Sequence, residues 1–145
     1  MTQRAHWIGV AARDHVDQGV AGGFCMFAHG KHVAAKRLTP GDRFAYYAPM
    51  TGMGAGETVR AFVAIGEILG VPPVQHSMGE AGTGWGRAAR YFSGHAADIY
   101  PLLAQLSFVT NSAHWGMYFR KSLFKIDGED FGLIAHAMGA FDALD

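Results

Sequence analysis

Tryptophans and an adjacent pair of tyrosines are the side chains whose types and positions say most about chemistry. Trp7, Trp85, Trp115 and the pair Tyr46-Tyr47 stand near glycine-rich or turn segments. Flat aromatic faces stack on nucleobases, and glycines let a flat ligand approach the backbone closely. The pattern indicates a site for a stacked base. The alternative is that each ring fills the core and satisfies its polar end there.

Other chemistries suggested by the residue types lack the pattern that they require. The glycine-rich stretch 52–56 precedes a strand-like run, whereas a dinucleotide loop must precede a helix. His29 and His32 are close enough to share a metal ion, but no third ligand is indicated. Neither a G-x-S-x-G elbow nor a paired acid–base site occurs in the sequence. We therefore expect a non-catalytic protein without a metal or cofactor.

The neutral charge of the chain hides an uneven distribution. The 145 residues contain 12 Lys+Arg and 12 Asp+Glu. All 12 basic residues and seven of the acids lie in 1–126, which carries a net charge of +5, and 127–145 carries −5. A basic body suits a polyanionic partner such as nucleic acid. The alternative for the acidic segment is an ordinary solvated helix.

Length and composition predict a single domain over residues 1–145. Hydrophobic residues make up 50% of the chain, which excludes disorder of the whole chain. Cys25 is the one cysteine, so an intrachain disulfide is excluded. Residues 1–10 lack the apolar core of a signal peptide, and no apolar run has the length of a membrane span. We therefore expect a soluble cytoplasmic protein that does not contact a membrane.

Hydrophobic periodicity and turn residues predict an α+β fold. Asp14 and Asp127 are expected to cap two helices, and a stripe of apolar residues predicts a third helix over 99–106. Pro49 is expected to end a strand, and 51–57 and 81–86 are expected to be loops. The predicted strands cover 6–11, 24–28, 44–48, 59–69, 74–78, 87–93 and 122–126. The fold would be a small β-barrel of six to seven strands with flanking helices.

The order of several short motifs resembles the EVE domain, a member of the PUA-like superfamily to which the YTH and ASCH domains also belong. No single motif is specific, but their number and order are, over about residues 5–138. The motifs are Trp7-Ile8-Gly9-Val10, 19–24, Pro40-Gly41-Asp42, 46–49, 54–57, 61–66, 101–103, 106–108, Trp115-Gly116, Phe119-Arg120 and Asp130-Phe131. The resemblance implies a PUA-like barrel with a pocket for a modified base of DNA or RNA.

By the same resemblance, the pocket would draw on the turn 22–24, on the strand end 47–48 and on Trp115. Ala48 stands where related domains place a small hydroxyl residue, which removes one possible hydrogen bond. Arg90 and Arg120 are basic residues near these aromatic side chains, which suits a stacked base. The expected ligand-binding residues are therefore Trp7, Gly22, Gly23, Phe24, Tyr47, Ala48, Arg90, Trp115 and Arg120.

Three hypotheses about function follow. The first is a non-catalytic module that binds nucleic acid carrying a modified base, which would be stacked on Trp115 or Tyr47. The second is a protein-interaction or regulatory module without a nucleic-acid ligand, using the acidic C-terminal segment. The third, with least support, is an enzyme that processes a base.

Overall fold

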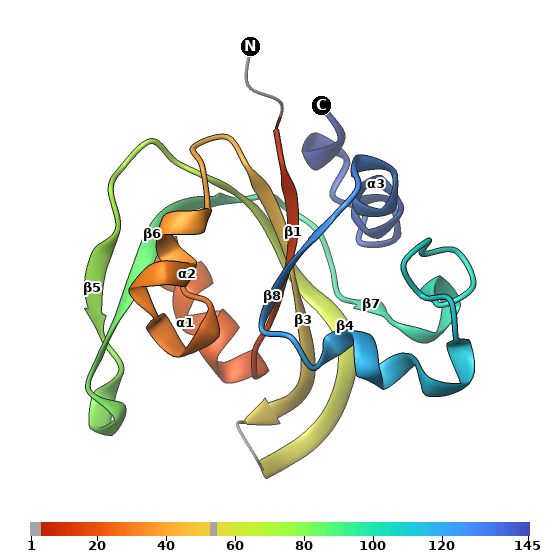
Figure 1. Ribbon diagram of the computed structural model, residues 1–145, viewed down its shortest axis with the longest axis horizontal. Coiled ribbons are helices and arrows are strands. Elements are labelled where there is room, and N and C mark those ends of the chain that lie inside the picture. Colours follow the sequence, from red (N-terminus) through yellow and green to blue (C-terminus); the bar gives the residue numbers. More distant parts are fainter. Residues whose placement is uncertain (1–3, 53–54) are drawn as a thin grey trace.

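The computed structural model describes residues 4–52 and 55–145 and has a curled, mixed β-sheet flanked by helices (Figure 1). The strand order is β2-β6-β4-β3-β1-β8, with β5 beside β6 and β7 beside β4. Strands β1 and β3 are parallel, and the other pairs are antiparallel. The strands are β1 (His6–Val10), β2 (Phe24–Cys25), β3 (Arg43–Gly52), β4 (Ala55–Ile68), β5 (Val74–Ser77), β6 (Thr83–Tyr91), β7 (Ala97–Asp98) and β8 (Leu123–Ile126). The α+β class is confirmed, with eight strands in the described chain.

Short helices connect the strands and cover the sheet. The α-helices are α1 (Arg13–Gly22), α2 (His32–Arg37) and α3 (Gly128–Ala137). Single 3₁₀ segments are η1 (Ala28–Gly30), η2 (Gly79–Ala81), η3 (Tyr100–Leu102), η4 (Ser112–Phe119) and η5 (Phe141–Leu144). The segment α1–β2–η1–α2 forms the crossover that the parallel pair β1 and β3 requires, since no tight turn can join parallel strands.

Two of the three predicted helices differ from expectation. Helix α1 begins at Arg13 with Ala12 as its N-cap, so the prediction of Asp14 as the cap is wrong. The stripe over 99–106 is buried as expected, but only η3 is helical there. Asp127 does cap α3, because its side chain accepts a hydrogen bond from the backbone N–H of Asp130.

The strand ends also differ. Strand β3 continues through Pro49 to Gly52. The register between β3 and β4 shifts beside Pro49, and such an irregularity accommodates a residue that has no N–H to donate to the neighbouring strand. The predicted loops at 51–57 and 81–86 are therefore largely strand, although residues 53 and 54 lie outside the described residues. The predicted strand 24–28 stops at Cys25, because the N–H and the carbonyl of Met26 bond to the Tyr46 hydroxyl and not to a neighbouring strand. Ala28 and His29 then adopt left-handed backbone angles.

The sheet has a hydrophobic cluster on each face. Adjacent Tyr46 and Tyr47 point to opposite faces, as the two-residue period of a strand requires. Tyr46 belongs to a cluster with Trp7 and Phe44, and Tyr47 belongs to one with residues of α3 and η4. Each tyrosine is thus buried, but the two rings pack against opposite faces of the sheet.

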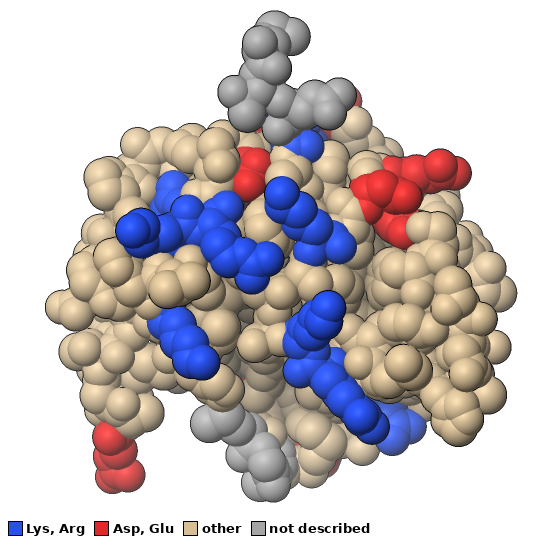
Figure 2. All heavy atoms as spheres, viewed as in Figure 1, with Lys and Arg blue, Asp and Glu red and all other residues tan. Residues whose placement is uncertain are grey.

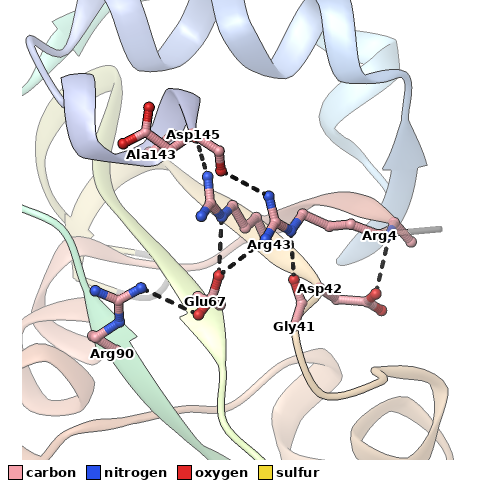
Figure 3. Close-up of polar contacts among 9 residues, drawn as sticks. Arg4, Gly41, Asp42, Arg43, Glu67, Arg90, Ala143 and Asp145 are labelled. Carbon is pink, nitrogen blue, oxygen red and sulfur yellow. Dashed lines mark hydrogen bonds and ion pairs between the residues drawn. The ribbon is translucent and has the colours of Figure 1, made fainter. Parts of the chain in front are cut away.

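Glu67 joins three arginines at one end of the sheet (Figure 3). Its carboxylate accepts hydrogen bonds from Arg43 Nε at 3.1 Å and from Arg90 at 3.2 Å, and Arg4 lies 3.6 Å away. Arg43 and Arg4 also donate to the backbone carbonyls of Ala143 and Asp145. The cluster therefore ties the C-terminal residues to β3 and β4.

We expect Glu67→Gln to lower the free energy of unfolding by about 1–3 kcal/mol at neutral pH. Burial alone would raise the pKa of Glu67, but hydrogen bonds from Arg43 and Arg90 outweigh it and hold this pKa below its ordinary value. The ionised form thus stabilises the fold above the ordinary pKa, and this contribution is lost as the pH falls through the lowered value. Urea unfolding at pH 7 and at about pH 3 would measure the loss of stability at neutral pH and its decrease in acid. Glu57→Gln is the control, because Glu57 is exposed. A loss that is equal at both pH values would contradict the ionic explanation.

Candidate functional site

Two adjoining hollows lie beside the first turn of α1, and together we call them the α1 cleft. Their volumes are about 120 and 240 Å³, and they share Ala12, His15, Met26 and Met78. The rest of the lining is Val10, Ala11, Asp14, Gln18, Phe24, Ala28, His29, Gly52, Ser77, Ala81 and Ser122. The cleft therefore combines apolar and thioether walls with a few polar groups, which is the usual lining of a small-molecule site.

Hydrogen bonds hold the Met26 wall of the α1 cleft in place. The Tyr46 hydroxyl accepts from the Met26 N–H and donates to the Met26 carbonyl, both at 2.9 Å. His15 Nε2 lies 3.1 Å from the same carbonyl. A hydrogen bond there requires the proton on Nε2, which leaves Nδ1 of a neutral ring as an acceptor. Tyr46 is fully buried, and burial raises its pKa, so its hydroxyl stays protonated.

The backbone that borders the cleft after Met26 is strained. Ala28 and His29 have φ of 52° and 57°, and Gly30 follows at 76°. Left-handed angles cost roughly 1–3 kcal/mol at residues with a side chain, and they cluster at ligand-binding segments. They turn the chain sharply, so that Ala28 and His29 both line the cleft.

A second hollow, the aromatic hollow, has a volume of about 250 Å³. It is lined by Tyr47, Pro49, Arg60, Trp115, Gly116 and Phe119. The Tyr47 ring stacks on Phe119 at 4.2 Å and meets Trp115 edge-on at 6.4 Å. Burial raises the pKa of Tyr47 to about 12, so its hydroxyl remains a donor at neutral pH.

The predicted site residues are divided between these places. Tyr47 and Trp115 share the aromatic hollow, whereas Phe24 lines the α1 cleft and stacks on His76 at 4.0 Å. Gly23 ends α1 with a φ of 72°, and Gly22 leaves room for the Phe24 ring, which lies 2.7 Å from where a Cβ would stand. The expected single pocket that joins turn 22–24 to Tyr47 and Trp115 is therefore not formed.

Other predicted residues line neither place. Trp7 is 2% exposed, and its indole Nε1 donates to Asp42 at 3.0 Å. The structure therefore supports the core-packing alternative for this ring. Ala48 is fully buried next to Ala61, and Arg90 is bound to Glu67. Arg120 is exposed, directly after Phe119 of the aromatic hollow.

Four residues that line these hollows were not predicted from the sequence: His15, Met26, Met78 and Arg60. Met26 and Met78 are ordinary core residue types in segments without a motif, so nothing marks them locally. Arg60 did carry a signal, because it is a charged residue near the start of the apolar run 59–69. Such an interruption indicates either an edge position or a functional side chain.

Basic residues gather on one face of the molecule, over α2, over β8 and below β8 in the view of Figure 2. The exposed basic residues of α2 are Lys36 and Arg37, and those on or just before β8 are Arg120, Lys121 and Lys125. Within residues 4–52 and 55–145, all three ion pairs involve Glu67, so none of these five cations is neutralised by a carboxylate. Acidic residues in Figure 2 lie mainly to the side, near α3, and they do not cover the basic face.

Two further observations limit the chemistry of the described residues. In the ranges 4–52 and 55–145, no three His, Cys, Asp or Glu side chains are grouped as a metal site would require. In the same ranges, no helix has the length and hydrophobicity to cross a membrane.

Comparison of folds places the chain among known structures. Protein Atu2648 from Agrobacterium tumefaciens matches with a TM-score of 0.59 at 12% identity, and the match covers 93% of each chain. Rpa0253 from Rhodopseudomonas palustris matches with a TM-score of 0.56 at 18% identity, again over 93% of each chain. These similarities show that the chain shares its overall fold with both proteins.

Sequence comparison identifies the family. The UPF0310 protein msl3206 of Mesorhizobium japonicum is 40% identical over 138 residues, which is 94% of this chain and 93% of that protein. The UPF0310 protein YdcG of Bacillus subtilis is 34% identical over 134 residues, or 92% of each. The family model of the EVE domain matches residues 5–137, and the chain is therefore a member of the EVE domain family.

Proposed function

We propose that this chain is a non-catalytic module that binds nucleic acid and takes a modified nucleobase into the α1 cleft. The observation that carries the proposal is the lining of the cleft. Met26, Met78 and Phe24 supply apolar walls, and His15 with Gln18 supplies polar groups. A nucleobase has apolar faces and a polar edge, and it is recognised by contacts of both kinds.

The thioether walls support a modified base in particular. Met is flexible and polarisable, so it adapts to an added methyl or hydroxymethyl group more readily than a rigid side chain does. Membership of the EVE domain family supports the same ligand class, because the resemblance implies a pocket for a modified base.

The basic face supports a polymeric ligand. Arg120 and Lys121 immediately precede Ser122, which lines the α1 cleft. Phosphates beside a bound base would therefore meet cations that carboxylates do not neutralise. Neutralising phosphates releases counterions, so we expect affinity to fall steeply between about 50 and 200 mM salt.

Fluorescence anisotropy with labelled single-stranded oligonucleotides tests the proposal. The probes carry cytosine, 5-methylcytosine, 5-hydroxymethylcytosine, adenine or N6-methyladenine at the centre, as DNA and as RNA. We expect a modified probe to bind more tightly than its plain counterpart. We expect His15→Leu to weaken that binding about 2- to 10-fold, because it removes a polar contact of about 0.5–1.5 kcal/mol.

The matched control is His136→Leu, because His136 is exposed on α3 and lines neither hollow. His136→Leu should bind each probe as tightly as the parent protein does. If plain and modified probes bind alike and His15→Leu equals the control, recognition of a modified base in the α1 cleft is wrong.

A further inference from the structure

We propose that the aromatic hollow is a second nucleotide subsite, which stacks the nucleotide adjoining the one in the α1 cleft of the same single strand. This inference rests on the proposed function. The occupant would be a base stacked on Trp115, with its phosphate over Arg120 and Lys121. Aromatic platforms beside a cationic track are the usual means of holding single-stranded nucleic acid.

The α1 cleft and the aromatic hollow are both lined by residues of the same pair of strands, β1 and β3. Val10 lines the α1 cleft, and its register partner on β3 is Tyr47 of the aromatic hollow. Neighbouring strands are about 4.8 Å apart. In Figure 1 the first turn of α1, the end of β1 and η4 lie on the same lower side of the molecule, away from both termini. One short strand of nucleic acid could therefore reach both.

The α1 cleft and the aromatic hollow are also lined by residues that lie only three positions apart in the sequence. Phe119 lines the aromatic hollow, and Ser122 lines the α1 cleft. The residues between them, Arg120 and Lys121, are both exposed. Two cations thus stand on the connection where the phosphate between two bound bases would lie.

Arg60 is the most unusual residue of the aromatic hollow. Its φ is 49°, although it is not glycine, and it lies where the register between β3 and β4 shifts. Its guanidinium donates to the Tyr100 hydroxyl at 2.6 Å and lies 6.0 Å from the centre of the Trp115 ring. A bulge that re-aims a side chain at a strained residue is a common device of ligand sites.

Trp115 has the exposure that a stacking platform requires. It is half-buried, and its ring contacts Tyr47, Tyr100 and Phe119 edge-on at 5.6–6.4 Å. Among the described residues no aromatic ring stacks parallel on Trp115, and the Arg60 guanidinium lies over one of its faces. A flat ligand can then stack on it at little cost in side-chain entropy.

The experiment compares two probes and four variants. The probes are a modified nucleoside monophosphate, which can fill only one subsite, and an oligonucleotide of about seven nucleotides with the same base at its centre. The variants are Trp115→Phe, Trp115→Leu, Arg60→Asn and the control Trp85→Leu. They are compared with His15→Leu, the variant of the α1 cleft. Trp85 is half-buried on β6 against His32, away from both places. Asn tolerates left-handed angles, so Arg60→Asn removes the charge without adding backbone strain.

We expect Trp115→Leu to weaken oligonucleotide binding about 5- to 100-fold and to leave monophosphate binding unchanged, because stacking on one aromatic ring is lost. Trp115→Phe should retain most of the affinity. Arg60→Asn should cost the oligonucleotide about 2- to 5-fold. Thermal unfolding of each variant shows whether its fold is intact, and Arg60→Asn tests the subsite even if Trp115→Leu fails to fold.

The results separate the two proposals. One result would contradict the second subsite and leave the proposed function standing. In it, His15→Leu weakens the binding of both probes, but Trp115→Leu and Arg60→Asn bind the oligonucleotide as tightly as Trp85→Leu does. If the unmodified protein binds neither probe, both proposals fail.

Discussion

Asp42→Ala is expected to lower the free energy of unfolding by about 3–5 kcal/mol, because each buried donor that is left without its acceptor costs about 1–3 kcal/mol. Asp42 is 4% exposed and accepts three hydrogen bonds, from the Trp7 indole and from the N–H groups of Ala5 and Thr39, each at 3.0 Å. Alanine leaves all three donors without an acceptor. The carboxylate therefore fixes the turn before β3 and also the ring of Trp7 on β1.

Urea unfolding followed by tryptophan fluorescence measures this effect. Asp17→Ala is the matched control, because Asp17 is an exposed carboxylate on α1, and it should change stability by at most about 0.5 kcal/mol. Asp42→Asn, which keeps the shape and one acceptor, should fall between the two. Equal stability of Asp42→Ala and Asp17→Ala would show that this buried carboxylate contributes nothing.

Gly30→Ala is expected to cost about 2–5 kcal/mol, from two separate causes. The φ of 76° disfavours any side chain by roughly 1–2 kcal/mol. A Cβ would also stand 2.5 Å from Gly84 Cα and 3.1 Å from Met26 Sδ, and overpacking of this kind adds about 1–3 kcal/mol. The contacting atom of Gly84 is its Cα, which belongs to the backbone and cannot rotate away as a side chain could. The Met26 wall of the α1 cleft must shift with the neighbouring chain.

Gly79→Ala separates the two causes. Gly79 has a φ of 66°, but nothing lies within 4 Å of the position of its Cβ. It should therefore show only the conformational cost. Chemical denaturation of both variants measures the difference, and the same oligonucleotide probes should bind more weakly to Gly30→Ala alone. If the two variants lose equal stability, the close approach of Gly30 to Gly84 does not matter.

Local signals in the sequence were sufficient for some elements of the fold. Asp127 with Asp130 three residues later predicts the start of α3, because a cap is a contact within one turn. Helix α1 shows the limit of this reasoning. Asp14 is a good capping residue type, but the helix begins one residue before it, with Ala12 at the cap position and the α1 cleft beside it.

The candidate site depended on pairings that no local pattern contains. Trp7 has the residue type of a stacking platform, and only its distance to Asp42, 35 residues away, shows that its polar end is already satisfied. Met26 and Met78 meet across the α1 cleft from segments that are 52 residues apart. The family resemblance anticipated the α+β fold, but it did not place Tyr47 and Phe24 in separate hollows.

The position of β1 has a consequence for how the chain folds. This strand is made first, yet it lies between β3 and β8, and its residues pair with Arg43–Tyr47 and Leu123–Ile126. Loop-closure entropy must be overcome before such distant contacts form, which makes folding slow compared with that of a helical bundle. During synthesis, the edge of β1 that pairs with β8 stays unpaired until residue 126 has emerged. The nascent chain thus presents this apolar strand edge to chaperones until β8 has been made.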